Sequence, residues 1–440
     1  MTQIVSTSME ITEDKNKVNP IKGNLGFLSN FFNLSVIQIS NVLIQLFLFP
    51  LIIHVVGLEK FGVVMVVNSI ALLAGQIVNY GTGLSGIKDT ALNKTDSFKL
   101  GAIVFGILYT RLSLTVICLL ALPILYFFHY DFSYLLLALP IMFAEAVNPL
   151  FFFTGIEKLF LYNLANLFSK LCAAACILFV IKTPDNAPWV NFYLGIFNFG
   201  FYFLLGIYCV RSFNLNRPKF YLQNVFQILQ HNFYLVGNNI SVQLQQSFFL
   251  FAISAVHNPL LLGAYSVCDK IVWSFRLLLT AFSGAVFPTA VRLYNSGEDI
   301  WNRYKAKTNR YLAAGFALSA AVLFFFSPLI TKILTGHYDV LTGTFIRSAS
   351  LVPLVSSMNV LNVLDLLIRN RYADIFKIAM VLLLITVVVS LLLIMFGSAD
   401  YFGYFPLIIE SCSIPLYLYF IKSSVKKRRN GQKKNSDYPN

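Results

Sequence analysis

Charged residues are scarce in this sequence. They make up 12% of 440 residues, whereas an ordinary soluble domain has about 25%. Hydrophobic residues make up 57%, and the mean hydropathy is +0.71. Apolar stretches such as Ala102–Phe127 recur along the chain, and about 20 such residues cross the hydrocarbon core of a bilayer. Because backbone groups in lipid must be satisfied within their own segment, the composition excludes a soluble domain and predicts an all-α polytopic membrane protein.

Motifs for chemistry are also lacking. The cysteines all fall inside predicted spans and show no zinc-finger spacing, so neither a disulfide-stapled outer domain nor a zinc site is expected; they are Cys118, Cys172, Cys176, Cys209, Cys268 and Cys412. The five histidines have no HExxH or similar metal spacing. No nucleophile–base pair or phosphate-cradling loop is visible. We therefore predict that the protein is not an enzyme and has no catalytic residues, no metal site and no cofactor.

No signal peptide is expected either, since residues 1–26 are polar and mixed in charge. They predict a cytoplasmic N-terminal tail. Hydrophobic runs predict twelve spans, at 27–53, 63–87, 101–127, 133–155, 159–181, 190–210, 229–255, 260–284, 309–334, 344–368, 374–396 and 402–421. The expected organisation is helices 1–6 in 27–210, a cytoplasmic connection in 211–228, helices 7–12 in 229–421 and a basic cytoplasmic tail in 422–440.

The net charge of +14 has a one-sided distribution. If the N-terminus is cytoplasmic, the tails and the connections on that side hold 25 of the 33 basic residues, and the opposite side holds only Lys60, Lys182 and Lys332. This positive-inside pattern predicts that both termini lie in the cytoplasm and that the chain crosses the cytoplasmic membrane. The basic run Lys426–Arg429 is expected to face anionic membrane lipid rather than nucleic acid.

A weak internal repeat relates the two halves at an offset of about 201 residues. Val55–Ile70 aligns with Val256–Ile271, which brings Gly62 opposite Gly263 in the alignment. The repeat divides the twelve spans evenly and predicts two pseudo-symmetric six-helix lobes. Folds built from such repeats usually bind substrate between the lobes near mid-membrane.

Several short motifs near the start carry a family resemblance. They are NVLIQ at Asn41–Gln45, Pro50, the turn Gly57–Gly62 and NYGTG at Asn79–Gly83. Together with the number of spans, they resemble the O-antigen polysaccharide flippases of the Wzx type, which share the MOP superfamily with MATE drug exporters and the lipid II flippase. The resemblance implies a MATE-like fold and alternating-access transport of undecaprenyl-pyrophosphate-linked sugar repeat units. It also implies a lipid-linked oligosaccharide as substrate, polymerase and chain-length proteins as candidate partners, and candidate coupling to protons or sodium.

Two other classes of function stay open. A MATE-type small-molecule or drug exporter is one, although that resemblance would imply an acid in the first span, and 27–53 contains no Asp or Glu. A polytopic glycan polymerase or ligase is the other. Such enzymes typically present catalytic groups on a large outer loop, and every outer connection predicted here is about nine residues or fewer.

Charges inside the spans are the main candidates for a site. Each would cost about 2.5–3.5 kcal/mol at the bilayer centre, so they should face one another or an aqueous cavity. Cations outnumber anions four to two, which favours a cationic cavity that binds phosphate. The predicted substrate-binding residues are Arg111, Lys170, Lys270 and Arg276, and the predicted ion-coupling or charge-pair residues are Glu145 and Asp269.

A purely structural alternative pairs these charges between helices. Glu145 would pair with Lys170, and Asp269 would pair with Arg111 or with Arg276, which lies seven residues further along on the same helix face. Separately, Gln243, Gln245 and Gln246 form a polar group in the seventh span. We expect these amides to line a cavity, and hydrogen bonding between helices is the alternative.

Overall fold

The computed structural model describes residues 44, 47–123, 132–256 and 258–436. Every regular element among them is a helix, so the chain is an all-α membrane protein, as predicted. Ten helices, or pairs of successive helices, in this part are long and apolar enough to cross a membrane: Leu58–Leu92, Ser97–Ala121, Phe132–Gly155, Leu159–Val180, Trp189–Ser212, Pro259–Ser296, Glu298–Phe325, Val340–Ile368, Tyr372–Phe396 and Ala399–Lys422.

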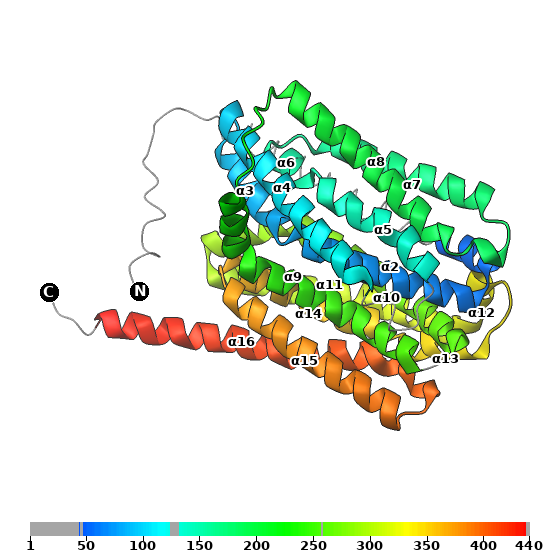
Figure 1. The fold of residues 1–440 in the computed structure, drawn as a ribbon. Coiled ribbons are helices and arrows are strands. Elements are labelled where there is room, and N and C mark those ends of the chain that lie inside the picture. Colours follow the sequence, from blue (N-terminus) through cyan, green and yellow to red (C-terminus); the bar gives the residue numbers. More distant parts are fainter. Residues whose placement is uncertain (1–43, 45–46, 124–131, 257, 437–440) are drawn as a thin grey trace.

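The first half of the chain supplies one group of helices, which Figure 1 colours from blue to green. They are α2 (Leu58–Asn79), α3 (Thr82–Leu92), α4 (Ser97–Ala121), α5 (Phe132–Val147), α6 (Leu150–Gly155), α7 (Leu159–Val180), the 3-10 turn η2 (Pro184–Asn186) and α8 (Trp189–Ser212). Most of the predicted first span, 27–53, lies outside the described residues. Only a short apolar helix at Phe47–Val56 is described near its end.

The second half supplies the remaining elements. They are α9 (Leu222–Val256), α10 (Pro259–Ser296), α11 (Glu298–Phe325), α12 (Ser327–Thr335), α13 (Val340–Ser348), α14 (Val352–Ile368), α15 (Tyr372–Phe396), the 3-10 segment η3 (Ala399–Tyr404) and α16 (Phe405–Ser436). Helix α9 covers the predicted seventh span, but it is not among the ten spanning segments, and it contains the polar stretch with Gln243, Gln245 and Gln246. The backbone helix of α16 continues into the predicted basic tail as far as Ser436 and projects beyond the bundle (Figure 1).

The predicted connection 285–308 is almost entirely helical. Helix α10 continues to Ser296, and α11 begins at Glu298. Only Gly297 separates the two helices, with φ +154°, a backbone conformation that favours glycine. The start of α10 is equally well specified, because the side chain of Asn258 accepts a hydrogen bond from the N–H of Leu260 and Pro259 occupies the first helical position.

The span predicted at 133–155 is interrupted near its expected cytoplasmic end. Residues 133–155 form α5 and α6, which are separated by Asn148 and Pro149. Proline has no N–H, so it cannot continue the hydrogen-bond ladder of α5. The last carbonyl groups of α5 therefore lack partners within the helix and must find them elsewhere.

The two halves meet where α2 packs against α10. Gly62 and Gly263, which the predicted repeat aligns, lie directly against each other. A Cβ atom at Gly62 would stand only 2.6 Å from the backbone nitrogen of Gly263. Helix α2 also packs on α5 in its own half and on α9 in the other half. The division into two six-helix lobes remains a prediction, with α2 as its central contact.

Candidate functional site

Arg111 joins three elements of the first half. Its side chain lies on α4 and is 2% exposed. The Nε atom donates to Thr82 Oγ1 at 2.9 Å, and Nη1 donates to the carbonyl oxygens of Glu145 at 3.1 Å and Asn148 at 2.8 Å. The guanidinium also lies 5.4 Å from the ring centre of Phe151. Arg111 therefore satisfies carbonyl groups that the interruption after α5 leaves without helical partners.

The Glu145 carboxylate is held beside this arginine by amides. Asn79 Nδ2 donates to it at 3.3 Å, and Asn148 Nδ2 lies 3.4 Å from each carboxylate oxygen. Tyr162 Oη donates in turn to Asn148 Oδ1 at 3.2 Å. Arg111 and Glu145 therefore belong to one polar centre in the first half, here called the N-half centre. Lys170 is partly buried on α7.

Asp269 and Lys270, which are adjacent on α10, form an ion pair with each other. Lys270 Nζ is 3.6 Å from Asp269 Oδ2, and the two side chains are 16% and 15% exposed. Lys270 also lines a small cavity of about 20 Å³ with Pro50 and Leu334. Asp269 therefore has a cationic neighbour on its own helix.

Arg276 pairs with Glu410 of α16 rather than with Asp269. Arg276 Nη2 is 2.9 Å from Glu410 Oε1, and Nε donates to the same oxygen at 3.0 Å. The two side chains line a cavity of about 420 Å³ together with Gln245, Gln246 and Asn359. The expectation that these glutamines line a cavity is confirmed for Gln245 and Gln246. The alternative also holds for Gln245, because its Nε2 donates to the carbonyl oxygen of Ala379 on α15 at 2.7 Å. The amide of Gln243 instead donates to Ser247.

This cavity, here called the C-half cavity, is lined by residues from α9, α10, α14, α15 and α16. Ser413 also lines it and accepts a hydrogen bond from Asn359 Nδ2. Among the described lining residues, Arg276, Glu410 and Tyr417 are the titratable ones. Amides, a hydroxyl and a guanidinium can together bind an anion or the hydroxyl groups of a sugar.

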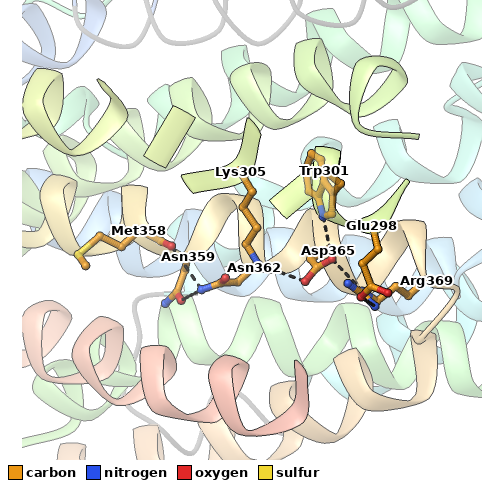
Figure 2. Close-up of polar contacts among 8 residues, drawn as sticks. All are labelled: Glu298, Trp301, Lys305, Met358, Asn359, Asn362, Asp365 and Arg369. Atoms are coloured by element: carbon orange, nitrogen blue, oxygen red, sulfur yellow. Dashed lines mark hydrogen bonds and ion pairs between the residues drawn. The ribbon is translucent and has the colours of Figure 1, made fainter. Parts of the chain in front are cut away.

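A second buried charge cluster lies close to Asn359 along α14 (Figure 2). Asp365 Oδ1 accepts from Trp301 Nε1 at 2.9 Å and from Arg369 Nε at 2.8 Å, while Oδ2 accepts from Lys305 Nζ at 3.1 Å. Arg369 Nη1 is also 2.7 Å from Glu298 Oε1. This Asp365 cluster fixes the start of α11 against the end of α14.

No cavity lined by the described residues contains all four predicted cations. Arg276 lines the C-half cavity, Lys270 lines a separate small one, and Arg111 belongs to the N-half centre. Sequence reasoning missed Glu410 as the partner of Arg276, and Lys305 as a partner of Asp365. A signal for the Asp365 cluster exists in the spacing of Glu298, Trp301 and Lys305, since residues three, four or seven apart share one helix face.

Comparisons with known proteins agree on one family and one fold. A family model described as polysaccharide biosynthesis protein matches residues 27–294. A relative from Shigella dysenteriae is 24% identical over 336 residues, which cover 75% of this chain and 83% of the relative. A relative from Escherichia coli K12 is 22% identical over 360 residues, covering 80% and 86%. Both are named "Putative O-antigen transporter".

Solved structures show the fold. An inward-facing MATE multidrug transporter of the MOP superfamily aligns with TM-score 0.75 at 11% identity, over 90% of this chain and 99% of that chain. A MOP superfamily transporter from Pyrococcus furiosus aligns with TM-score 0.63 at 11% identity, over 91% and 96%. The Pyrococcus protein is described as having a binding pocket of reversed polarity. The chain therefore has the MATE transporter fold.

Proposed function

This chain belongs to the polysaccharide biosynthesis protein family, and from that membership we propose that it carries a lipid-linked polysaccharide precursor across the cytoplasmic membrane. The names of its relatives support an O-antigen transporter of the MOP superfamily. The fold supports transport rather than enzymatic catalysis. The cargo that fits best is an undecaprenyl-pyrophosphate-linked oligosaccharide repeat unit. In this proposal both termini are cytoplasmic, and a polysaccharide polymerase and a chain-length protein act on the exported unit.

The observation that carries the proposal is the chemistry of the C-half cavity. Arg276 offers a planar fork for phosphate oxygens, while Gln245, Gln246 and Asn359 offer donors and acceptors for sugar hydroxyls. An incoming pyrophosphate would compete with Glu410 for the guanidinium. Glu410 therefore joins Glu145 and Asp269 as a candidate carrier of a coupling proton. Binding drives alternating access only if the ligand has different affinities for the two states.

A small-molecule exporter is the competing proposal, favoured by the multidrug transporters that share the fold. A deletion strain separates the alternatives. We expect it to lack surface polysaccharide and to accumulate intact lipid-linked single repeat units that face the cytoplasm. Loss of a polymerase would leave those units facing outward, and loss of a drug exporter would leave the surface glycan unchanged. Either of these outcomes would contradict the proposal.

Complementation of that strain tests the cation itself. We expect Arg276→Ala to lower surface glycan export by roughly 10- to 100-fold, since a hydrogen bond to a charged group contributes about 1.5–3 kcal/mol. The matched control is Arg292→Ala, which removes an exposed arginine from the same helix. Surface glycan and the amount of membrane-inserted protein should both be measured. Normal export by Arg276→Ala at normal abundance would contradict a role for the C-half cavity.

Alanine variants of two other predicted cations, Lys270 and Arg111, should affect export and protein abundance to different extents. Lys270→Ala should also lower export if Lys270 faces substrate in another state of the cycle. Arg111→Ala should lower the amount of folded protein as well, because it leaves the carbonyl groups of Glu145 and Asn148 unsatisfied. The ratio of export to membrane abundance separates the two effects.

A further inference from the structure

A further cavity, mostly apolar, is lined in the described part of the chain by residues that precede α9. It has a volume of about 590 Å³ and lies between α4 and α8, against the interruption that separates α5 from α6. This volume is in the range of about 300–1,000 Å³ that is typical of ligand pockets. Its lining is dominated by hydrophobic side chains of the two helices, among them Phe105, Leu108, Leu112, Phe203 and Ile207. We refer to it as the α4–α8 groove.

The groove is open toward the lipid rather than enclosed. Three of its lining side chains are large, apolar and exposed: Leu112 is 44% exposed, Phe203 is 49% and Ile207 is 36%. On a membrane-spanning helix, exposed apolar side chains face acyl chains. A lipid chain can therefore enter the groove sideways from the bilayer.

Two arginines stand at one end of the groove. Arg211 lies in the last turn of α8, and Arg217 follows in the connection to α9. Both are exposed, and neither forms an ion pair with an acid in the described part of the chain. Arg217 Nε donates to Tyr109 Oη at 2.8 Å, and its guanidinium lies 5.9 Å from the ring centre of Tyr109. Tyr109 therefore holds Arg217 on the α4 side of the groove.

At the other end of the groove, the cation already has partners and does not need an anion. Arg111 lines it, but its guanidinium already donates to Thr82, Glu145 and Asn148. The groove thus combines an apolar body with two cations that lack acidic partners at its predicted cytoplasmic end. This is the charge pattern that matches a lipid with a negative headgroup.

We infer that the α4–α8 groove binds an anionic phospholipid of the cytoplasmic leaflet. One acyl chain lies along the groove, and the phosphate lies between Arg211 and Arg217. Basic pockets between membrane helices on the cytoplasmic side bind anionic headgroups in this way, and guanidinium groups match phosphate oxygens in pairs. Every described residue that lines the groove precedes α9, whereas the proposed substrate cavity is lined by α9 and later helices. The inference does not depend on the identity of the transported molecule.

Lipid retention by the purified full-length protein tests this inference. Native mass spectrometry in neutral detergent should show that wild type retains phosphatidylglycerol in preference to zwitterionic phosphatidylethanolamine. Gly206 lines the groove and has open space at its Cβ position, so Gly206→Leu should fill the groove and abolish the preference. Gly200 on the same helix also has open space but lies outside the groove, so Gly200→Leu is the matched control.

The headgroup contact is tested separately. Removing both cations with Arg211→Gln and Arg217→Gln should weaken phosphatidylglycerol binding about 30-fold, at about 1 kcal/mol per basic residue near the membrane surface. Arg292→Gln with Arg303→Gln removes two exposed charges elsewhere and should leave binding unchanged. Equal retention of both lipids by wild type would overturn the inference. So would equal phosphatidylglycerol binding by the Gly206→Leu and Gly200→Leu variants, or displacement of phosphatidylglycerol by an equimolar amount of undecaprenyl diphosphate.

Discussion

Replacing Asp365 with Asn is expected to destabilise the protein by about 3–5 kcal/mol, the cost of breaking a buried ion pair. The carboxylate side chain is 2% exposed and accepts hydrogen bonds from Trp301, Lys305 and Arg369. An asparagine would preserve the shape but remove the negative charge. Arg369 would then keep only Glu298 as an acidic partner, and Lys305 would lose the carboxylate that it contacts. The midpoint of thermal aggregation in detergent measures the loss.

Two further variants show that charge is the cause. Asp299→Asn makes the same chemical change at an exposed position at the start of α11 and should leave the midpoint unchanged. Lys305→Met combined with Asp365→Asn restores the charge balance of the cluster and should recover part of the loss. If Asp365→Asn is as stable as Asp299→Asn, the cluster does not fix α11 against α14.

The membrane spans could be predicted from the sequence because hydrophobic run length is a local property. The sequence predicts that residues 101–127 cross the membrane, and Ser97–Ala121 is a helix of suitable length. Run length could not place the interruption within 133–155, although Pro149 marks it. It also could not show that the chain stays helical from Pro259 to Phe325 apart from Gly297. Polar helices outside the hydrocarbon core carry no apolar signal.

The candidate site shows the same limit. The sequence could show that the buried charges need partners, because placing an unpaired charge in lipid costs free energy. Which partner each charge has depends on packing between distant helices. Arg276 and Glu410 are 134 residues apart in the sequence, and Arg111 finds backbone carbonyls that no pattern of side chains reveals. Only pairs on one helix, such as Asp365 and Arg369, could be read from spacing.

Replacing Gly263 with Ala is expected to separate the halves at the contact between α2 and α10. A Cβ atom at this position would clash with the carbonyl oxygen of Leu58, and it would lie 2.7 Å from the carbonyl carbon of the same residue. Both are backbone atoms, so no side-chain rotation relieves the clash. Overpacking of this kind typically costs about 1–3 kcal/mol. We expect a lower thermal midpoint and a large loss of surface glycan export in the complemented deletion strain.

Gly200→Ala provides the control, since it adds the same methyl group to a helical glycine with open space around it. The conformational effect can be observed directly at Leu58, which is 7% exposed. In a protein whose six cysteines are replaced, Leu58→Cys should react slowly with a membrane-impermeant maleimide and much faster when Gly263→Ala is added. Because a Cβ atom at either Gly62 or Gly263 would meet backbone atoms of the other helix, the close approach of α2 and α10 requires glycine on both sides. An unchanged labelling rate would mean that the helices absorb the methyl group without separating, and the glycines would then have no role in holding the halves together.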